Sequence, residues 1–82
     1  MLEYRENFCQ MLRMARTAVN QSQQEVANVL GVNRATYTYY ELGRTTPDLD
    51  TLKCLLQLFH LTPEDIFYPE KYLGKNSFKK GA

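Results

Sequence analysis

The side chains with the clearest chemical potential lie close together in the chain, between residues 23 and 44. They are amides, hydroxyls, a phenol, two guanidinium groups and one methyl group, which form hydrogen bonds or small apolar contacts. No general base or metal-ligand cluster accompanies them, so they are suited to recognising a surface rather than to covalent chemistry. The group comprises Gln23, Asn33, Arg34, Ala35, Thr36, Thr38, Tyr39 and Arg44.

Residues typical of enzymes and metal sites are sparse elsewhere in the chain. The single histidine, His60, belongs to no nucleophile or metal-ligand pattern. Cys9 and Cys54 form no Cys-x-x-Cys site, and we interpret both as buried free thiols. We therefore expect no enzymatic activity, no cofactor and no metal. Without a long apolar run or a signal-peptide pattern, the chain is expected to be cytoplasmic and not membrane-bound.

Length and charge are consistent with one small domain. The chain has 82 residues, of which 44% are hydrophobic, and a formal net charge of +1. This composition supports one core and is not that of a disordered chain. The charge is uneven, because residues 45–70 are acidic and residues 71–82 contain lysines without any acid. Binding to nucleic acid must therefore depend on where particular residues point, and not on total charge.

Two short helices with strong end signals position the polar group. Ser22 and Glu25 have the spacing of a capping box, which starts a helix that we expect to end at Gly31. Asn33 is a good N-cap for a second helix over residues 34–42, which is followed by another glycine. Only a three-residue turn separates these two helices.

Further helices are predicted on both sides of this pair. Apolar residues at helical spacing predict a helix over about residues 6–18. Two later helices are expected to begin after the N-caps Asp48 and Thr62. The sequence thus predicts a five-helix domain over residues 6–68, followed by a basic tail or arm over residues 69–82.

Two short helices joined by a glycine-containing turn are typical of the helix-turn-helix unit, whose second helix enters the major groove of DNA. The close crossing of the helices needs a small residue, and Ala27 meets that need. Tyr37 and Tyr40 are spaced to face the same small core. An αα-hairpin without a role in DNA binding has the same spacing, so the pair of helices by itself leaves both interpretations open.

The wider sequence resembles the phage-repressor-like helix-turn-helix family (XRE, Cro/cI type) over about residues 8–67. The resemblance implies an all-α, five-helix, lambda-repressor-like DNA-binding domain with a central helix-turn-helix. It also implies a transcriptional regulator, with repression as the favoured mode, that binds a palindromic operator as a homodimer. The matching segments are Leu12-Arg13-Met14-Ala15-Arg16, Ser22-Gln23-Gln24-Glu25-Val26-Ala27, Leu30-Gly31-Val32-Asn33-Arg34, Tyr40-Glu41-Leu42-Gly43-Arg44 and Pro47-Asp48-Leu49-Asp50-Thr51-Leu52.

The outward face of the helix over residues 34–42 is the predicted base-reading surface. With Tyr37 and Tyr40 facing inward, the opposite face points to the major groove. Arg34 has the geometry to bind guanine O6 and N7 with two hydrogen bonds, and we rank it first. The predicted base contacts are Arg34, Ala35, Thr38 and Tyr39. Packing of a surface aromatic on the preceding helix is an equal alternative for Tyr39.

Groups at the ends of the two short helices are the predicted phosphate contacts, because such contacts fix the register of the protein on DNA. The resemblance implies a phosphate contact for Gln23, at the start of its helix, and for Arg44, in the family's Glu-x-Gly-Arg pattern. Asn33 and Thr36 can serve in the same way at the start of the second helix. A pure capping role for Asn33 and a solvated Arg44 are the alternatives.

Two further features concern structure and assembly. The resemblance implies that Arg16 and Glu41 form a partly buried ion pair, so neither is placed in the predicted site. The competing function is a protein-interaction module, such as an antitoxin-like or control protein that needs a partner chain. Its docking surface would also be the homodimer surface, formed by the C-terminal helix and tail with Ile66, Phe67, Tyr68, Tyr72 and Leu73.

Overall fold

The computed structural model describes the backbone of residues 2–81 and the side chains of residues 3–76. Over that range the chain is all-helical, as the sequence predicts. The segment over residues 69–82, expected as a tail or arm, forms a sixth helix over most of its length. The helices are α1 (Leu2–Ala18), α2 (Gln23–Leu30), α3 (Arg34–Leu42), α4 (Leu49–Phe59), α5 (Pro63–Phe67) and α6 (Pro69–Gly81).

The end signals read from the sequence are present around α2 and α3. The Ser22 hydroxyl accepts a bond from the Glu25 amide at 3.0 Å, and the Glu25 carboxylate accepts one from the Ser22 amide at 2.8 Å. Asn33 caps α3 with its side chain. Gly31 and Gly43 end the two helices in the left-handed conformation, with φ of 75° and 77°. These caps define the boundaries of both helices and the short turn between them.

The boundaries of the outer helices differ from the sequence prediction at both ends of the domain. α1 begins four residues earlier than the predicted start near residue 6. Its added turn is tied to α5, because the Tyr4 hydroxyl donates to the Ile66 carbonyl oxygen at 2.7 Å. At the other end, Pro69 lies at the first position of α6. Proline is favoured at that position because the first amide of a helix needs no partner.

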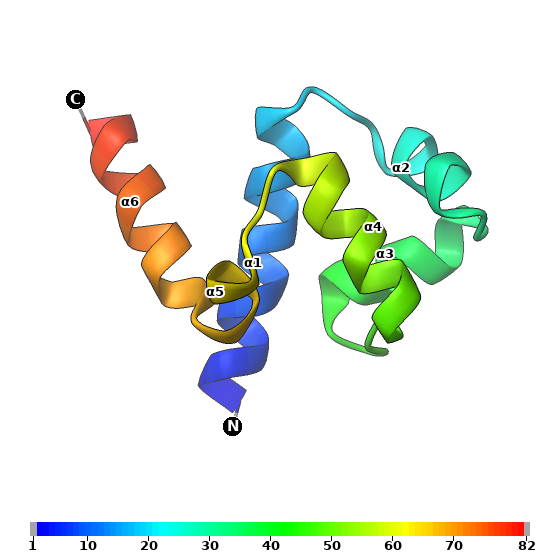
Figure 1. Cartoon of the computed structure of the whole chain (residues 1–82), viewed down its shortest axis with the longest axis horizontal. Helices are drawn as coiled ribbons and strands as arrows, with labels where there is room; N and C mark the ends of the chain where they lie inside the picture. The colour runs from blue at the N-terminus through cyan, green and yellow to red at the C-terminus, as the bar shows by residue number, and fades with distance from the viewer. Residues whose placement is uncertain (1, 82) are drawn as a thin grey trace.

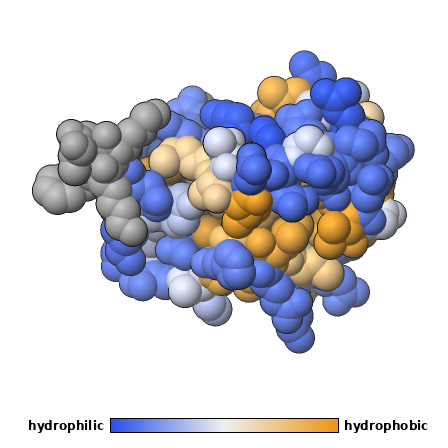
Figure 2. Space-filling view, turned by 90° about the horizontal axis from the view of Figure 1, so that it is seen from above, coloured by the Kyte–Doolittle hydropathy of each residue, from blue (hydrophilic) through white to orange (hydrophobic). Residues whose placement is uncertain are grey.

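The core is shared by α1 to α5, and partly exposed residues of α6 pack on it. The small, fully buried Ala27 allows α2 to lie close to the other helices. Viewed from above, apolar atoms also reach the surface in the middle of the face, between polar margins (Figure 2). The buried cluster consists of Phe8, Met11, Leu12, Ala15, Val26, Ala27, Tyr37, Tyr40, Leu55, Phe59, Leu61 and Ile66.

Helix α1 lies between the C-terminal helix α6 and the pair of helices α2 and α3. Figure 1 shows α6 on one side of α1, with α2 and α3 on the other side. Helix α1 packs against α3, α4 and α6. The exposed face of α3 therefore belongs to the half of the domain away from the C-terminal helix. Within the residues that the structure describes, no helix has the length and apolar character needed to cross a membrane.

Two expectations about exposure are corrected by the structure. Cys9 is buried, but Cys54 is exposed because it precedes the inward-facing Leu55 and is turned away from the core. The expected C-terminal apolar surface is also smaller, since Ile66 is buried in the core.

Tyr72 and Leu73 of α6 pack against that core and are only partly exposed. Phe67 and Tyr68, at 71% and 52% exposure, are the members of the expected surface that face outward. The C-terminal apolar surface is therefore centred on the junction between α5 and α6.

Candidate nucleic-acid interface

Helices α2 and α3 form a compact pair whose crossing is set by the turn and by two tyrosines. The Val32 amide donates to the Ala27 carbonyl oxygen at 3.1 Å, which closes the end of α2. On α3, the rings of Tyr37 and Tyr40 meet edge to face with centroids 6.0 Å apart, and both are buried. The inward direction predicted for the two tyrosines is confirmed. Their packing fixes which face of α3 points outward.

The outward face of α3 carries most of the predicted base-contacting residues. Arg34 and Ala35 are exposed at the first turn, and Tyr39 is 44% exposed one turn later. Leu42 extends this face and is 58% exposed. Thr38 is only half-exposed at the edge next to α2. The outward direction of the face is as expected, whereas contacts with bases stay a prediction.

The far end of α3 is held from behind by two arginines of α1. Arg5 donates from its guanidinium to the Gly43 carbonyl oxygen at 2.7 Å, and Arg13 donates to the Glu41 carbonyl oxygen at 2.9 Å. The last carbonyl groups of a helix lack intrahelical partners and carry partial negative charge. The two cations therefore satisfy these carbonyl groups and anchor α3 to α1.

Sequence reasoning missed this anchoring role of Arg5 and Arg13. A signal is present, because the two residues lie two helical turns apart with Cys9 midway between them. The Cys9 thiol lies 3.5 Å from the Tyr40 carbonyl oxygen, so this whole stripe of α1 faces the end of α3. Spacing alone does not reveal which helix such a stripe meets.

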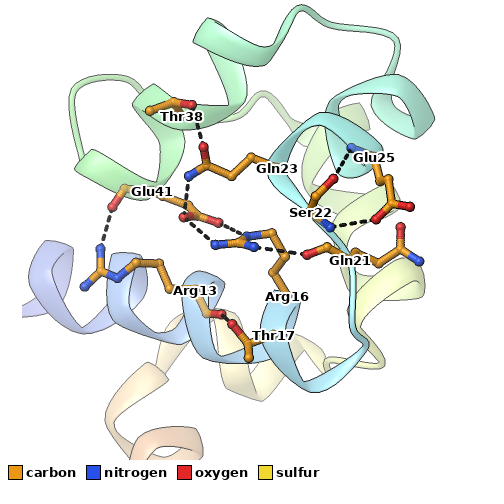
Figure 3. Close-up of polar contacts among 9 residues, drawn as sticks. All are labelled: Arg13, Arg16, Thr17, Gln21, Ser22, Gln23, Glu25, Thr38 and Glu41. Carbon is orange, nitrogen blue, oxygen red and sulfur yellow. Dashed lines mark hydrogen bonds and ion pairs between the residues drawn. The ribbon is translucent and has the colours of Figure 1, made fainter.

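An ion pair joins α1 to α3 below the outward face, as Figure 3 shows. The Arg16 Nε atom lies 2.6 Å from Glu41 Oε2, and the Glu41 side chain is only 2% exposed. Arg16 also donates to the Gln21 carbonyl oxygen at 3.0 Å, which ties down the connection before α2. The ion pair implied by the family resemblance is confirmed.

The surroundings of Glu41 favour its charged form. Burial by itself raises the pKa of the Glu41 carboxyl, but hydrogen bonds from Arg16 and Gln23, together with the nearby Tyr37 hydroxyl, outweigh it and lower the pKa below the ordinary value of 4.5. The Tyr37 hydroxyl is buried and has no hydrogen-bond partner among the described residues. Burial raises the pKa of Tyr37, so this phenol is neutral at physiological pH.

The side-chain amide of Gln23 is used within the protein. Its nitrogen donates to Glu41 Oε1 at 3.0 Å, and its oxygen accepts from the Thr38 hydroxyl at 3.1 Å (Figure 3). Gln23 therefore links the ion pair to the edge of the α3 face. A phosphate contact by Gln23 and a base contact by Thr38 stay predictions, and each would share or replace one of these bonds.

The remaining predicted phosphate contacts lie at the two ends of α3. The Asn33 side-chain oxygen accepts from the Thr36 amide at 2.8 Å, so its predicted capping role is confirmed. Beyond the other end, Arg44 is exposed, and its guanidinium lies 5.8 Å from the centroid of the Tyr39 ring. This cation–π contact restrains Arg44 beside the outward face.

The fold and this arrangement define a helix-turn-helix module. A family model described as helix-turn-helix matches residues 12–66, and the chain belongs to this family. It is the XRE-type family that the sequence resemblance indicates. A module of this family is not an enzyme, so the expectation against enzymatic activity is confirmed at the level of the family.

Two curated relatives are longer than this chain. The chain is 37% identical over 57 residues to the SPbeta prophage-derived uncharacterized HTH-type transcriptional regulator YonR of Bacillus subtilis (strain 168), covering 70% of this chain and 53% of that protein. It is 29% identical over 66 residues to the HTH-type transcriptional activator BcrR of Enterococcus faecalis, covering 80% of this chain and 32% of that protein. No solved structure matches the chain significantly.

Proposed function

We propose that this chain binds double-stranded DNA sequence-specifically in the cytoplasm and acts as a transcriptional regulator. The observation that carries the proposal is the outward face of α3, which is exposed at Arg34, Ala35 and Tyr39 but anchored along its inner side. A rigid helix with exposed hydrogen-bonding and methyl groups is suited to the major groove, where each base pair presents a distinct pattern. The regulator names of both relatives support the same proposal.

Arg34 is the leading candidate for base recognition in this proposal. It is the first residue of α3, it is exposed, and it belongs to neither of the ion pairs among the described side chains. In a helix-turn-helix protein, the N-terminal part of the second helix points at the base edges. A guanidinium there is free to form two parallel hydrogen bonds with guanine, and Ala35 is suited to contact a thymine methyl group.

Phosphate contacts are proposed at both ends of α3 and at the start of α2. Asn33 uses its side-chain oxygen as the cap, which leaves its amide nitrogen for a phosphate. Thr36 lies in the first turn of α3, and Arg44 is held beside Tyr39. At the start of α2, the backbone amides around Gln23 and the positive end of the helix favour an anion even while the side chain is engaged.

We further propose that the chain acts as a homodimer through the junction between α5 and α6. Phe67 and Tyr68 are exposed there, and α6 lies across α1 from the helix-turn-helix unit. Two copies that meet at this junction leave both α3 faces free. A palindromic operator requires the two α3 helices to lie about 34 Å apart, one turn of DNA.

Selection of bound sequences from a randomised duplex pool tests the proposed function. We expect the wild-type chain to enrich a palindrome, and Arg34→Ala to lose preference at one base pair in each half-site. Lys75→Ala is the matched control, because it removes the same charge from the exposed surface of α6. A folded wild-type chain that enriches no sequence at low salt would overturn the proposal and favour a partner-dependent interaction module.

A further inference from the structure

A cavity of about 510 Å³ lies behind the end of α3. Its apolar walls come from Tyr4 and Phe8 of α1, Leu52 of α4 and Ile66 of α5. The Tyr4 and Phe8 rings are stacked with centroids 6.1 Å apart, so they form one continuous aromatic wall. The volume falls within the range of roughly 300–1,000 Å³ that is usual for sites that bind small molecules.

The cavity has few polar residues, and Arg5 is the only charged residue among those that line it. Arg5 lines it, together with Cys9 and with Thr45 and Thr46 in the loop after α3. No acidic side chain is among the residues that line it. Burial raises the pKa of the Cys9 thiol, which is therefore neutral at physiological pH.

The nearest acidic groups are directed elsewhere. Glu41 is paired with Arg16, and Glu3 and Glu70 line a separate pocket that shares only Tyr4 with this cavity. The cavity thus combines an aromatic wall with one cation and without an opposing anion.

We propose that this cavity binds a small aromatic carboxylate, with its ring against Tyr4 and Phe8 and its carboxylate on Arg5. Arg5 donates one N–H group to the Gly43 carbonyl oxygen, and the other four N–H groups of its guanidinium are available to a ligand. A planar guanidinium binds a carboxylate with two parallel hydrogen bonds. Thr45 and Thr46 also line the cavity, and their side chains carry hydroxyl groups that can donate to a carboxylate.

The position of Arg5 connects this cavity to the recognition helix. The same guanidinium that would hold the ligand also holds the Gly43 carbonyl oxygen, at the residue that ends α3. Arg44 follows directly in the chain. Binding of a ligand in the cavity is therefore expected to change the affinity for DNA. This consequence rests on the proposed function, whereas the binding of the ligand itself is independent of it.

Binding is tested on the full chain without DNA, by titrating 1-naphthaleneacetate and its neutral analogue 1-naphthaleneacetamide and following backbone amide NMR shifts. We expect the carboxylate to shift amides around the cavity and to bind about tenfold more tightly than the amide. Leu52→Phe, which reduces the cavity volume, should weaken the binding of both probes. DNA binding is measured separately, so either property can fail alone.

Substitutions of α1 arginines separate the ligand site from stability. Arg5→Gln should abolish the preference for the carboxylate, and Arg5→Lys should retain it in part. Arg13→Gln is the matched control, because Arg13 also bonds a carbonyl group at the end of α3 but does not line the cavity. The proposal would be overturned if both probes bound with equal affinity, or if a millimolar concentration of probe caused no NMR shift. It would also be overturned if the amides that line the cavity shifted only with protein concentration, a result that would indicate occupation of the cavity by a second copy.

Discussion

The Thr38 hydroxyl donates a hydrogen bond to the side-chain oxygen of Gln23 at 3.1 Å, and this bond joins α3 to the start of α2. Both residues belong to the predicted DNA-contacting set, and in the structure they contact each other. Since the Gln23 nitrogen donates to Glu41, the amide orientation is defined by partners at both ends. The edge of the α3 face is thus connected to the ion pair beneath it.

Thr38→Val is predicted to weaken DNA binding equally for all operator sequences. The substitution leaves the Gln23 oxygen without its donor, and a loss of about 1 kcal/mol corresponds to roughly fivefold in affinity. Thr38→Ser, which keeps the hydroxyl, should stay close to wild type. Dissociation constants on the selected operator and on its single-base variants are the measurement. A changed preference at one base pair would instead show that Thr38 reads a base directly.

Glu41→Gln is predicted to lower the free energy of unfolding by about 3 kcal/mol, because it leaves Arg16 without its charged partner. Glu64→Gln is the matched control, since Glu64 forms an ion pair with Lys71 in which both side chains are more than half exposed. Glu64→Gln should lower the free energy of unfolding by less than about 1 kcal/mol. Urea denaturation of both variants makes the comparison, and similar losses would contradict a special role for the buried pair.

Acid is predicted to destabilise the wild type more steeply than the Glu41→Gln variant. The folded-state pKa of Glu41 is lowered from 4.5, so the unfolded chain binds this proton first as the pH falls. The stabilising contribution is therefore present above pH 4.5 and is lost as the pH falls through the lower, folded-state pKa.

The pKa of Asp48 is lowered from 3.8 by hydrogen bonds from Thr51, so the Asp48 contribution is lost at a lower pH and equally in both proteins. The difference between the two unfolding curves therefore isolates Glu41. The free energy of unfolding, followed from neutral pH to below 4.5, is the measurement, and parallel curves would refute the prediction.

The two helix-ending glycines are predicted to respond differently to the same substitution. Gly31→Ala meets no atom within 4 Å, so its cost of roughly 1–2 kcal/mol reflects the left-handed backbone alone. In Gly43→Ala the added methyl carbon lies 3.1 Å from the Cys9 sulfur and 3.3 Å from Arg5 carbons. Gly43→Ala should therefore cost more than Gly31→Ala in chemical denaturation, and equal costs would mean that α1 adjusts freely.

Phe67→Ser is predicted to shift the chain from dimer to monomer. Phe67 is 71% exposed at the junction between α5 and α6, where we propose the dimer contact. Leu49→Ser is the matched control, since Leu49 is 83% exposed at the start of α4. Molar mass from light scattering during size-exclusion chromatography gives the result. Dissociation by Leu49→Ser alone would move the interface to α4.

Local signals in the sequence predicted the central part of the fold well. The Ser22–Glu25 capping box, the Asn33 cap and the two glycines define α2 and α3 through bonds between residues close in the chain. Such bonds depend on residue type and short spacing, which a sequence displays directly. For the same reason, the inward direction of Tyr37 and Tyr40 could be predicted from their spacing.

Contacts between distant residues were decided only by the tertiary structure. The bonds of Arg5 and Arg13 to the end of α3 span 38 and 28 residues, and their partners are backbone carbonyl groups that every residue has. The exposed position of Cys54 and the small outward part of the C-terminal apolar surface depend on which helix covers which face. The chain alone thus determined helices α2 to α5, most of α1 and the direction of the α3 face, because those follow from local geometry. The packing of α1 decided how that face is anchored and where the cavity behind it lies, because those follow from the meeting of segments far apart in sequence.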